Sequence, residues 1–312
     1  MYRKTMALKM NPFGPAFSPG PENLDRLEFL ANLDREPLRL DECGEMLRPL
    51  FCDNILDLND HMEKFRDLMM ELDYSFEGAG ARSINSALMV IRGALGSGKT
   101  TLGAWMIAEM IRLQGDDPWA VFHVRELPFD TDESRTSAFT QLQDQIAAVP
   151  KGKHVAVLVD NITAASLNAA IACYEKLRAW PKLFVLTTHN LKLLDADERT
   201  MGGSVPIEVF TLREMTAADA DAYVAHRLPQ YRDPERAEIE ALSPIFPFEP
   251  GQPGRVVQRG EDQGASPVVL RQLNTHFRKR LAAHARHVRE LQLPAVEQVP
   301  ADTLPQYLMS DQ

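Results

Sequence analysis

Eight consecutive residues have the glycines, the lysine and the hydroxyl group that phosphate binding requires. The segment Gly93-Ala94-Leu95-Gly96-Ser97-Gly98-Lys99-Thr100 matches the pattern G-x-x-x-x-G-K-[ST] and leads through Thr101 into a helical pattern. Glycines permit backbone conformations that other residues avoid, so successive amides can point at phosphate oxygens. The lysine of such a loop meets the β- and γ-phosphates, and the hydroxyl ligates Mg²⁺. We therefore expect residues 93–101 to bind Mg-ATP; the alternative is an ordinary glycine turn.

A single carboxylate follows a second apolar run. Residues 155–159 read Val-Ala-Val-Leu-Val and are followed by Asp160. An acid at the carboxyl end of a parallel strand lies at the sheet edge where phosphate loops also lie. Asp160 is therefore predicted to hold Mg²⁺ through its water shell, with Thr100 as the second metal residue. The alternative is a strand that ends in a turn or a helix cap.

Short apolar runs alternate with helical patterns between residues 84 and 213, which is typical of a parallel sheet with crossover helices. The predicted strands are 88–92, 120–124, 155–159, 183–187 and 207–211. The predicted helices are 100–114, 137–149 and 165–179. This order predicts an α/β fold with a doubly wound parallel five-stranded sheet over residues 84–213.

Helical segments are predicted on both sides of this core. Residues 1–83 are expected to form a proline-rich arm and then a helical extension, because apolar residues recur at helical spacing from residue 23 to residue 73. Residues 214–293 are expected to form a helical lid. Its first helix is capped by Thr216 and stopped by Pro229, and after a loop rich in proline and glycine its long helix starts at Pro267. Residues 294–312 are expected to be a disordered tail.

The composition excludes several classes of protein. The 312 residues carry a net charge of −10, which disfavours a surface that grips phosphate backbones throughout. The three cysteines form no C-x-x-C pair, so neither a disulfide framework nor a zinc site is indicated. No apolar run approaches the roughly 18 residues needed to cross a bilayer, and prolines interrupt the start of any signal peptide. We expect a cytoplasmic protein without a membrane partner.

A whole strand, at 120–124, lies in the chain between the phosphate loop and the Asp160 strand. With these three segments the chain resembles the AAA+ superfamily of P-loop ATPases, which belongs to the additional-strand class, over about residues 86–281. The segment 210–228 resembles the entry to the lid of the origin-recognition-like and STAND-like branches. The resemblance implies an ATPase that couples its nucleotide state to assembly on, or remodelling of, a macromolecular partner, and that forms a homo-oligomer or AAA+-like assembly. A small-molecule kinase shares the loop, but the inserted strand and the long lid weigh against it.

One departure from the family concerns hydrolysis. Relatives usually place a catalytic Glu directly after the strand carboxylate, whereas this chain has Asn161. Loss of a general base costs about 10² to 10⁴ in rate. Glu126, just past the second strand, could supply a carboxylate as in recombinase-type relatives, although a surface Glu is the simpler interpretation. The alternative function is a nucleotide-gated switch or scaffold with little hydrolysis.

The resemblance also implies residues that sense the γ-phosphate. Thr188 is our first candidate for the sensor after the fourth strand and Asn190 our second, although both are ordinary turn residues. Arg199 lies in the interval where relatives carry an arginine that reaches across a subunit interface; a solvated arginine is the alternative.

The long lid helix raises two further questions. Where many relatives have Pro-Arg, this chain has Pro267-Val268, so Arg271, one turn later, is the candidate for the second sensor. The basic helix 271–289 could contact nucleic acid. A solvated lid face is favoured, because Phe277 is the only aromatic residue in that helix and the chain is acidic overall.

Overall fold

The computed structural model describes residues 60–77, 86–113, 119–124, 132–151, 153–194, 207–230, 244–262 and 268–290. They belong to two compact units, one ending at residue 213 and the other beginning at residue 214. No helix in these ranges has both the length and the hydropathy of a bilayer-spanning segment.

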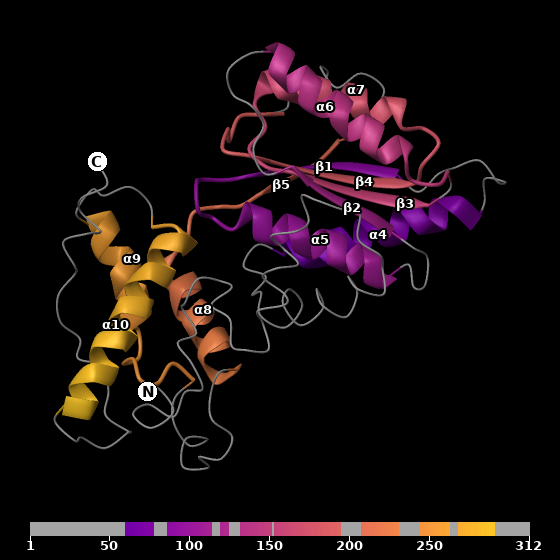
Figure 1. The fold of residues 1–312 in the computed structure, drawn as a ribbon. Helices are drawn as coiled ribbons and strands as arrows, with labels where there is room; N and C mark the ends of the chain where they lie inside the picture. The colour runs from indigo at the N-terminus through magenta and orange to yellow at the C-terminus, as the bar shows by residue number, and fades with distance from the viewer. Residues whose placement is uncertain are drawn as a thin grey trace. The chain divides into compact units, whose positions relative to one another are not determined.

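The first unit is built on five parallel strands, as predicted (Figure 1). They are β1 (Ser86–Arg92), β2 (Trp119–Val124), β3 (His154–Val159), β4 (Lys182–Thr188) and β5 (Ile207–Thr211). Their order in the sheet is β2-β3-β4-β1-β5. The strand inserted in the chain before β3 is β2, but in space β2 lies at the sheet edge, and β4 separates β1 from β3. In this order, the carboxyl ends of the neighbouring parallel strands β2, β3, β4 and β1 lie side by side, on one side of the sheet.

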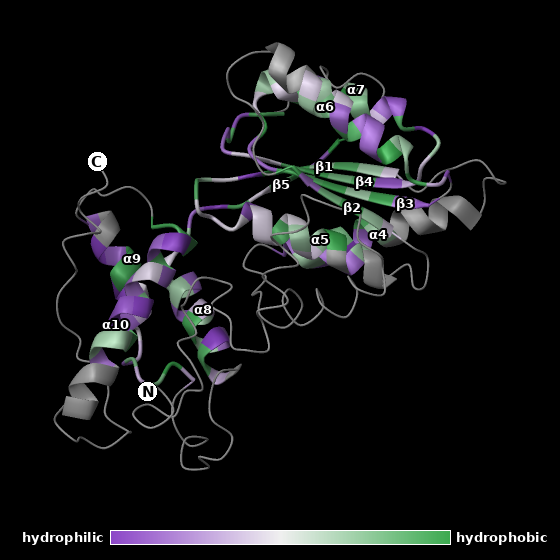
Figure 2. Ribbon diagram, viewed as in Figure 1, coloured by the Kyte–Doolittle hydropathy of each residue, from purple (hydrophilic) through white to green (hydrophobic). Residues whose placement is uncertain are grey.

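Helices cover both faces of the sheet, so the predicted doubly wound arrangement is confirmed (Figure 1). The helices are α4 (His61–Glu77), α5 (Lys99–Leu113), α6 (Asp132–Ala147) and α7 (Ala164–Lys176). Met89 and Ile91 of β1 pack toward α4 and α5, whereas Leu88 and Val90 pack toward α6 and α7. Burial on both faces explains why the strands read as continuous apolar runs, which Figure 2 shows as green strands between the helices.

Helix α4 is the part of the predicted N-terminal extension that lies among the described residues; the rest of 1–83 lies outside them, apart from Asp60. The Phe65 ring meets Trp105 of α5 edge to face, with centroids 5.7 Å apart. Nε2 of His61 donates to the carbonyl oxygen of Thr211, 2.9 Å away, at the end of the edge strand β5. The helix therefore packs on the same face as α5 and satisfies part of the open edge of the sheet.

The second unit is helical, with α8 (Ala217–Gln230), α9 (Gln252–Asp262) and α10 (Leu270–Glu290). Pro229 lies within the last turn of α8, so it does not stop the helix at residue 228. Helix α9 lies where a loop was predicted. Its proline, Pro253, is in the first turn, where no amide donor is needed, and Val256 and Val257 are buried. The density of turn-forming residues concealed this short helix.

A buried histidine in α10 makes the stability of this unit depend on pH. His276 is almost fully buried, and burial together with the nearby charge of Arg280 lowers its pKa from 6.5 to about 4. Between pH 6.5 and pH 4 this histidine is therefore protonated in the unfolded chain but neutral in the folded chain. The free energy of unfolding falls as the pH falls through this window. From pH 7 to pH 5 we expect a loss of about 2 kcal/mol from this group.

Thermal unfolding of the wild type and of His276→Gln at both pH values measures this effect. The substitution should reduce the loss between pH 7 and pH 5 that the wild type shows by about 2 kcal/mol. An equal pH dependence in the two proteins would contradict the assignment to His276.

Candidate functional site

The phosphate loop, residues 93–100, connects β1 to α5 at the carboxyl edge of the sheet. Gly96 and Gly98 have φ angles of 82° and 99°, in the left-handed region that favours glycine. The carbonyl of Gly98 accepts from the amide of Leu102 at 2.9 Å, so the loop passes directly into the helix. The loop therefore ends at the start of α5, where helix amides favour a bound anion.

Lys99 lies beneath this loop with only 5% of its surface exposed. Its Nζ donates to the carbonyl oxygens of Gly93 at 2.8 Å and Ala94 at 2.7 Å, and to Nδ1 of His189 at 2.9 Å. Burial lowers the pKa of the amine to about 8, against the opposing effect of the Asp160 charge. The pKa of His189 is also lowered, by burial and then by the Lys99 charge, which suits a neutral ring that accepts a hydrogen bond. A cation is thus held where the loop would enclose phosphate.

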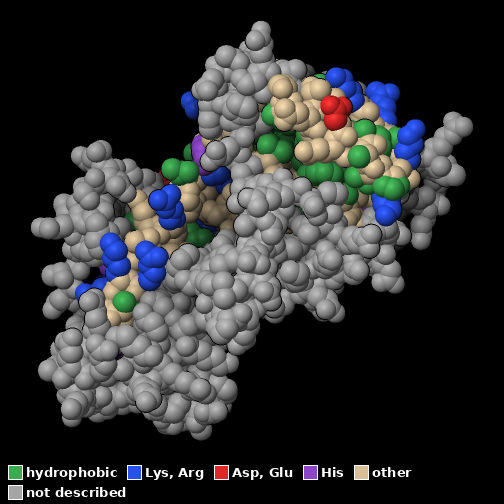
Figure 3. Space-filling view, viewed as in Figure 1, with side chains coloured by type: hydrophobic (Ala, Val, Ile, Leu, Met, Phe, Trp, Pro, Cys, Tyr) green, Lys and Arg blue, Asp and Glu red, His purple; other side chains and the backbone are tan. Residues whose placement is uncertain are grey.

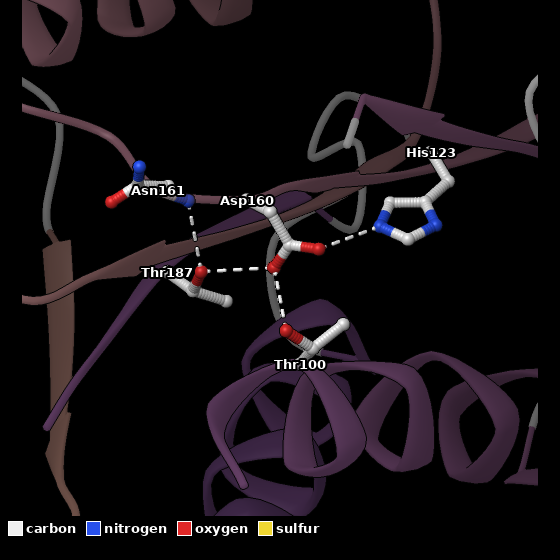
Figure 4. A network of polar contacts seen from close by, with 5 residues as sticks. All are labelled: Thr100, His123, Asp160, Asn161 and Thr187. Atoms are coloured by element: carbon white, nitrogen blue, oxygen red, sulfur yellow. Dashed lines mark hydrogen bonds and ion pairs between the residues drawn. The ribbon is translucent and has the colours of Figure 1, made fainter. Parts of the chain in front are cut away.

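The Asp160 carboxylate is the centre of a second network (Figure 4). Its Oδ1 accepts from the hydroxyls of Thr100 and Thr187, both at 2.9 Å, and its Oδ2 lies 2.9 Å from Nε2 of His123. Burial would raise the pKa of this carboxyl. The hydrogen bond and charge of His123, with the two hydroxyl bonds, outweigh burial and leave the pKa below its usual value. The carboxylate is therefore charged at neutral pH.

This donor set fits a magnesium ion that arrives with a nucleotide. Thr100 and Asp160 offer hard oxygen ligands, which Mg²⁺ prefers. No group of three or more His, Cys, Asp or Glu side chains within the described ranges could hold a metal by itself. Mg²⁺ at nucleotide sites takes most of its ligands from phosphates and water, so two protein oxygens suffice.

Asn161 contributes no carboxylate and is held in an unusual backbone conformation. Its φ angle is 61°, a left-handed value that Asn tolerates better than Glu. Its amide nitrogen donates to the hydroxyl of Thr187 at 3.1 Å, and its side chain points away from the Asp160 carboxylate (Figure 4). The residue after the strand carboxylate is thus poorly placed to polarise a water molecule.

The two sensor candidates form no hydrogen bond with the Lys99 amine, which bonds to Gly93, Ala94 and His189. The Thr188 hydroxyl is fully buried and donates to the carbonyl of Ile162 at 2.7 Å. The side chain of Asn190 is exposed, and its Oδ1 accepts from a backbone amide two residues later. His189, between them, is the residue that meets Lys99. The sensor roles stay predictions.

Sequence reasoning missed His123, Thr187 and His189. Each lies near or just after the carboxyl end of a strand, on the same side of the sheet as Asp160. Which of these strands are neighbours depends on the strand order in the sheet, which the chain order does not reveal. Two predicted residues, Glu126 and Arg199, lie outside the described residues. Arg271 is exposed on α10 and belongs to the other unit.

No protein-family profile matches the chain, and no curated protein matches it in sequence. Solved structures do resemble it. The Aeropyrum pernix ORC1 protein, solved in complex with DNA, is 11% identical with a TM-score of 0.51, covering 85% of this chain and 67% of that one. The Aeropyrum pernix ORC2 protein, in ADPNP-ADP complexes, is 14% identical with a TM-score of 0.48, covering 82% and 72%. Trip13 from Rhizobiales is 17% identical with a TM-score of 0.41, covering 93% and 100%.

Proposed function

We propose that this chain, which has the AAA+ ATPase fold, binds Mg-ATP and couples its nucleotide state to assembly on, or remodelling of, a macromolecular partner. One observation carries the proposal of Mg-ATP binding. The first turn of the helix after the phosphate loop is joined to the strand carboxylate by the 2.9 Å bond from Thr100 to Asp160, beside the buried Lys99. The loop lysine, the threonine hydroxyl and the carboxylate, which Mg-ATP binding needs at one site, therefore lie next to one another.

Each of these residues has a definite part in this proposal. Lys99 would turn from its loop carbonyls to the β- and γ-phosphates. Thr100 would ligate Mg²⁺ directly and Asp160 would hold it through water. A bound Mg²⁺ would neutralise the negative charge of the phosphates. Amides of the loop and of the first turn of α5, including that of Thr101, would meet the remaining phosphate oxygens.

A second function, a nucleotide-gated switch with little hydrolysis, is favoured by Asn161. Its side chain is an amide and points away from Asp160, so hydrolysis lacks the usual base from this position. We propose slow turnover unless Glu126 supplies the base, and we retain Arg199 as the candidate for a contact between subunits. Phosphate release of several per second that is lost in Glu126→Gln would favour the hydrolytic function. Tight ATP binding with almost no release would favour the switch.

The basic side chains of the helical unit bear on the nature of the partner. Figure 3 shows Lys and Arg side chains over the unit that holds α9 and α10. The sequence of α10 includes Arg271, Arg278, Lys279 and Arg280. Nucleic-acid binding by this face remains the less favoured proposal, because the whole chain carries a net charge of −10.

Particle mass and phosphate release, measured on the same samples with ATP, with ADP and with Lys99→Ala, would separate assembly from catalysis.

The lowered pKa of Lys99 predicts how nucleotide affinity changes with pH. Phosphate favours the charged amine, whose pKa is about 8 in the free protein. Affinity should therefore be greatest below pH 8 and fall as the pH rises through that value, by about tenfold between pH 7 and pH 9. The dissociation constant for ATP at pH 7, 8 and 9 measures the effect. In Lys99→Arg the pH dependence should vanish, because arginine stays charged. The same slope in both proteins would contradict the role of this amine.

A further inference from the structure

His123 is a partner of Asp160 that no part of the proposed function uses. It lies near the carboxyl end of the edge strand β2, and its side chain is 8% exposed. Its Nε2 lies 2.9 Å from Oδ2 of Asp160. Its other ring nitrogen, Nδ1, is buried and forms no hydrogen bond with the described residues. Among the described residues, the ring therefore forms one hydrogen bond, to Asp160.

This contact restricts how the carboxylate can turn. Oδ1 of Asp160 already accepts from Thr100 and Thr187, and Oδ2 accepts from His123, so both oxygens have fixed donors from three different elements (Figure 4). Without the imidazole, Oδ2 would lose its hydrogen-bond donor in a partly buried position. The carboxylate could then rotate or move toward solvent, and Oδ1 would no longer face Thr100.

The geometry does not suit His123 as a general base. Nε2 is occupied by the carboxylate, and Nδ1 is buried away from solvent, so neither nitrogen can accept a proton from a water molecule in this arrangement. The contact does suit a residue that orients a metal-binding carboxylate. Partners of this kind typically change metal affinity by about 10-fold to 100-fold when they are removed.

We propose that His123 is a positioning residue, which donates from Nε2 to Oδ2 of Asp160 and thereby holds Oδ1 toward Thr100 for the magnesium ion of a bound nucleotide. The inference rests on the proposed function, because it assumes that Mg-nucleotide binds at this edge. The orientation of Asp160 matters more here than in a site with two adjacent acids, because residue 161 is Asn and Asp160 is the carboxylate of this network.

Titration of Mg²⁺ into protein with a fluorescent ADP analogue tests this inference. His123→Leu removes the donor, His123→Gln carries an amide that can replace Nε2, and His123→Asn carries one too short to reach. The Mg²⁺ concentration at half-maximal effect should rise about 10-fold to 100-fold in the Leu and Asn variants. In the Gln variant it should stay within about threefold of the wild type. Affinity for the analogue in EDTA should be equal in all four proteins.

His154→Leu is the matched control, because His154 begins the neighbouring strand β3 at the opposite edge of the sheet. It should leave the Mg²⁺ dependence unchanged. If His123→Leu fails to fold, the comparison of Gln with Asn decides. Wild-type Mg²⁺ dependence in the Asn variant, or in a folded Leu variant, would overturn the inference. If the wild type binds no analogue with or without Mg²⁺, the proposed function itself is wrong.

Discussion

Replacing Lys99 with alanine should lower the affinity for ATP by about 100-fold while the protein stays folded. Removing one partner of a buried charge pair costs about 2 to 5 kcal/mol, and each 1.4 kcal/mol is tenfold in affinity. Lys99 is only 5% exposed, and its amine bonds to the loop carbonyls of Gly93 and Ala94. Calorimetric titration of ATP into the wild type and Lys99→Ala measures the change.

The chain offers a closely matched control for this substitution. Lys182, at the start of β4, is also 5% exposed, and burial likewise lowers its pKa to about 8. Its Nζ donates to the carbonyl of Leu177 and lies 4.3 Å from the centroid of the Tyr174 ring, at the opposite edge of the sheet. Lys182→Ala should lower the melting temperature but leave ATP affinity unchanged. An equal loss of affinity in both variants would show that Lys99 acts only through stability.

Asp160→Asn should abolish the part of nucleotide affinity that depends on Mg²⁺. The amide keeps the shape of the side chain but removes the negative charge that a bound cation requires. We expect at least about a 100-fold increase in the Mg²⁺ concentration needed for half-maximal binding of ADP, with unchanged or slightly tighter binding in EDTA. The EDTA measurement matters, because loss of a negative charge near the phosphates can only favour the metal-free anion.

Asp144→Asn is the control for the charge change, since Asp144 is exposed on α6. It should alter neither measurement. If Asp160→Asn binds nucleotide with the Mg²⁺ dependence of the wild type, the carboxylate does not take part in metal binding, and the proposed site loses one of its two metal residues.

Much of the sheet unit was predictable because its physics is local. Strands buried on both faces must be apolar throughout, so runs such as 155–159 stand out, and their observed bounds differ from the predicted ones by at most two residues. The phosphate loop was predictable for the same reason, since its glycines and its lysine are close in sequence and form one bend. Helix α9 was missed because prolines and glycines, which usually indicate turns, outnumbered its few buried valines.

The polar contacts of the site were not predictable in the same way. His123 reaches Asp160 because β2 pairs with β3 in register, with Val124 opposite Val159, and pairing between strands is a tertiary property. His189 reaches Lys99 because β4 lies beside β1. The sequence does reveal the amide at Asn161, but the backbone angle of 61° that turns its side chain away appears only in the structure.

The most direct test of the central claim is calorimetric titration of ATP into the wild-type protein, once with Mg²⁺ and once with EDTA. If the phosphate loop and Asp160 form one nucleotide site, ATP should bind with about one molecule per chain and more tightly when Mg²⁺ is present. Absence of ATP binding under both conditions would contradict the claim.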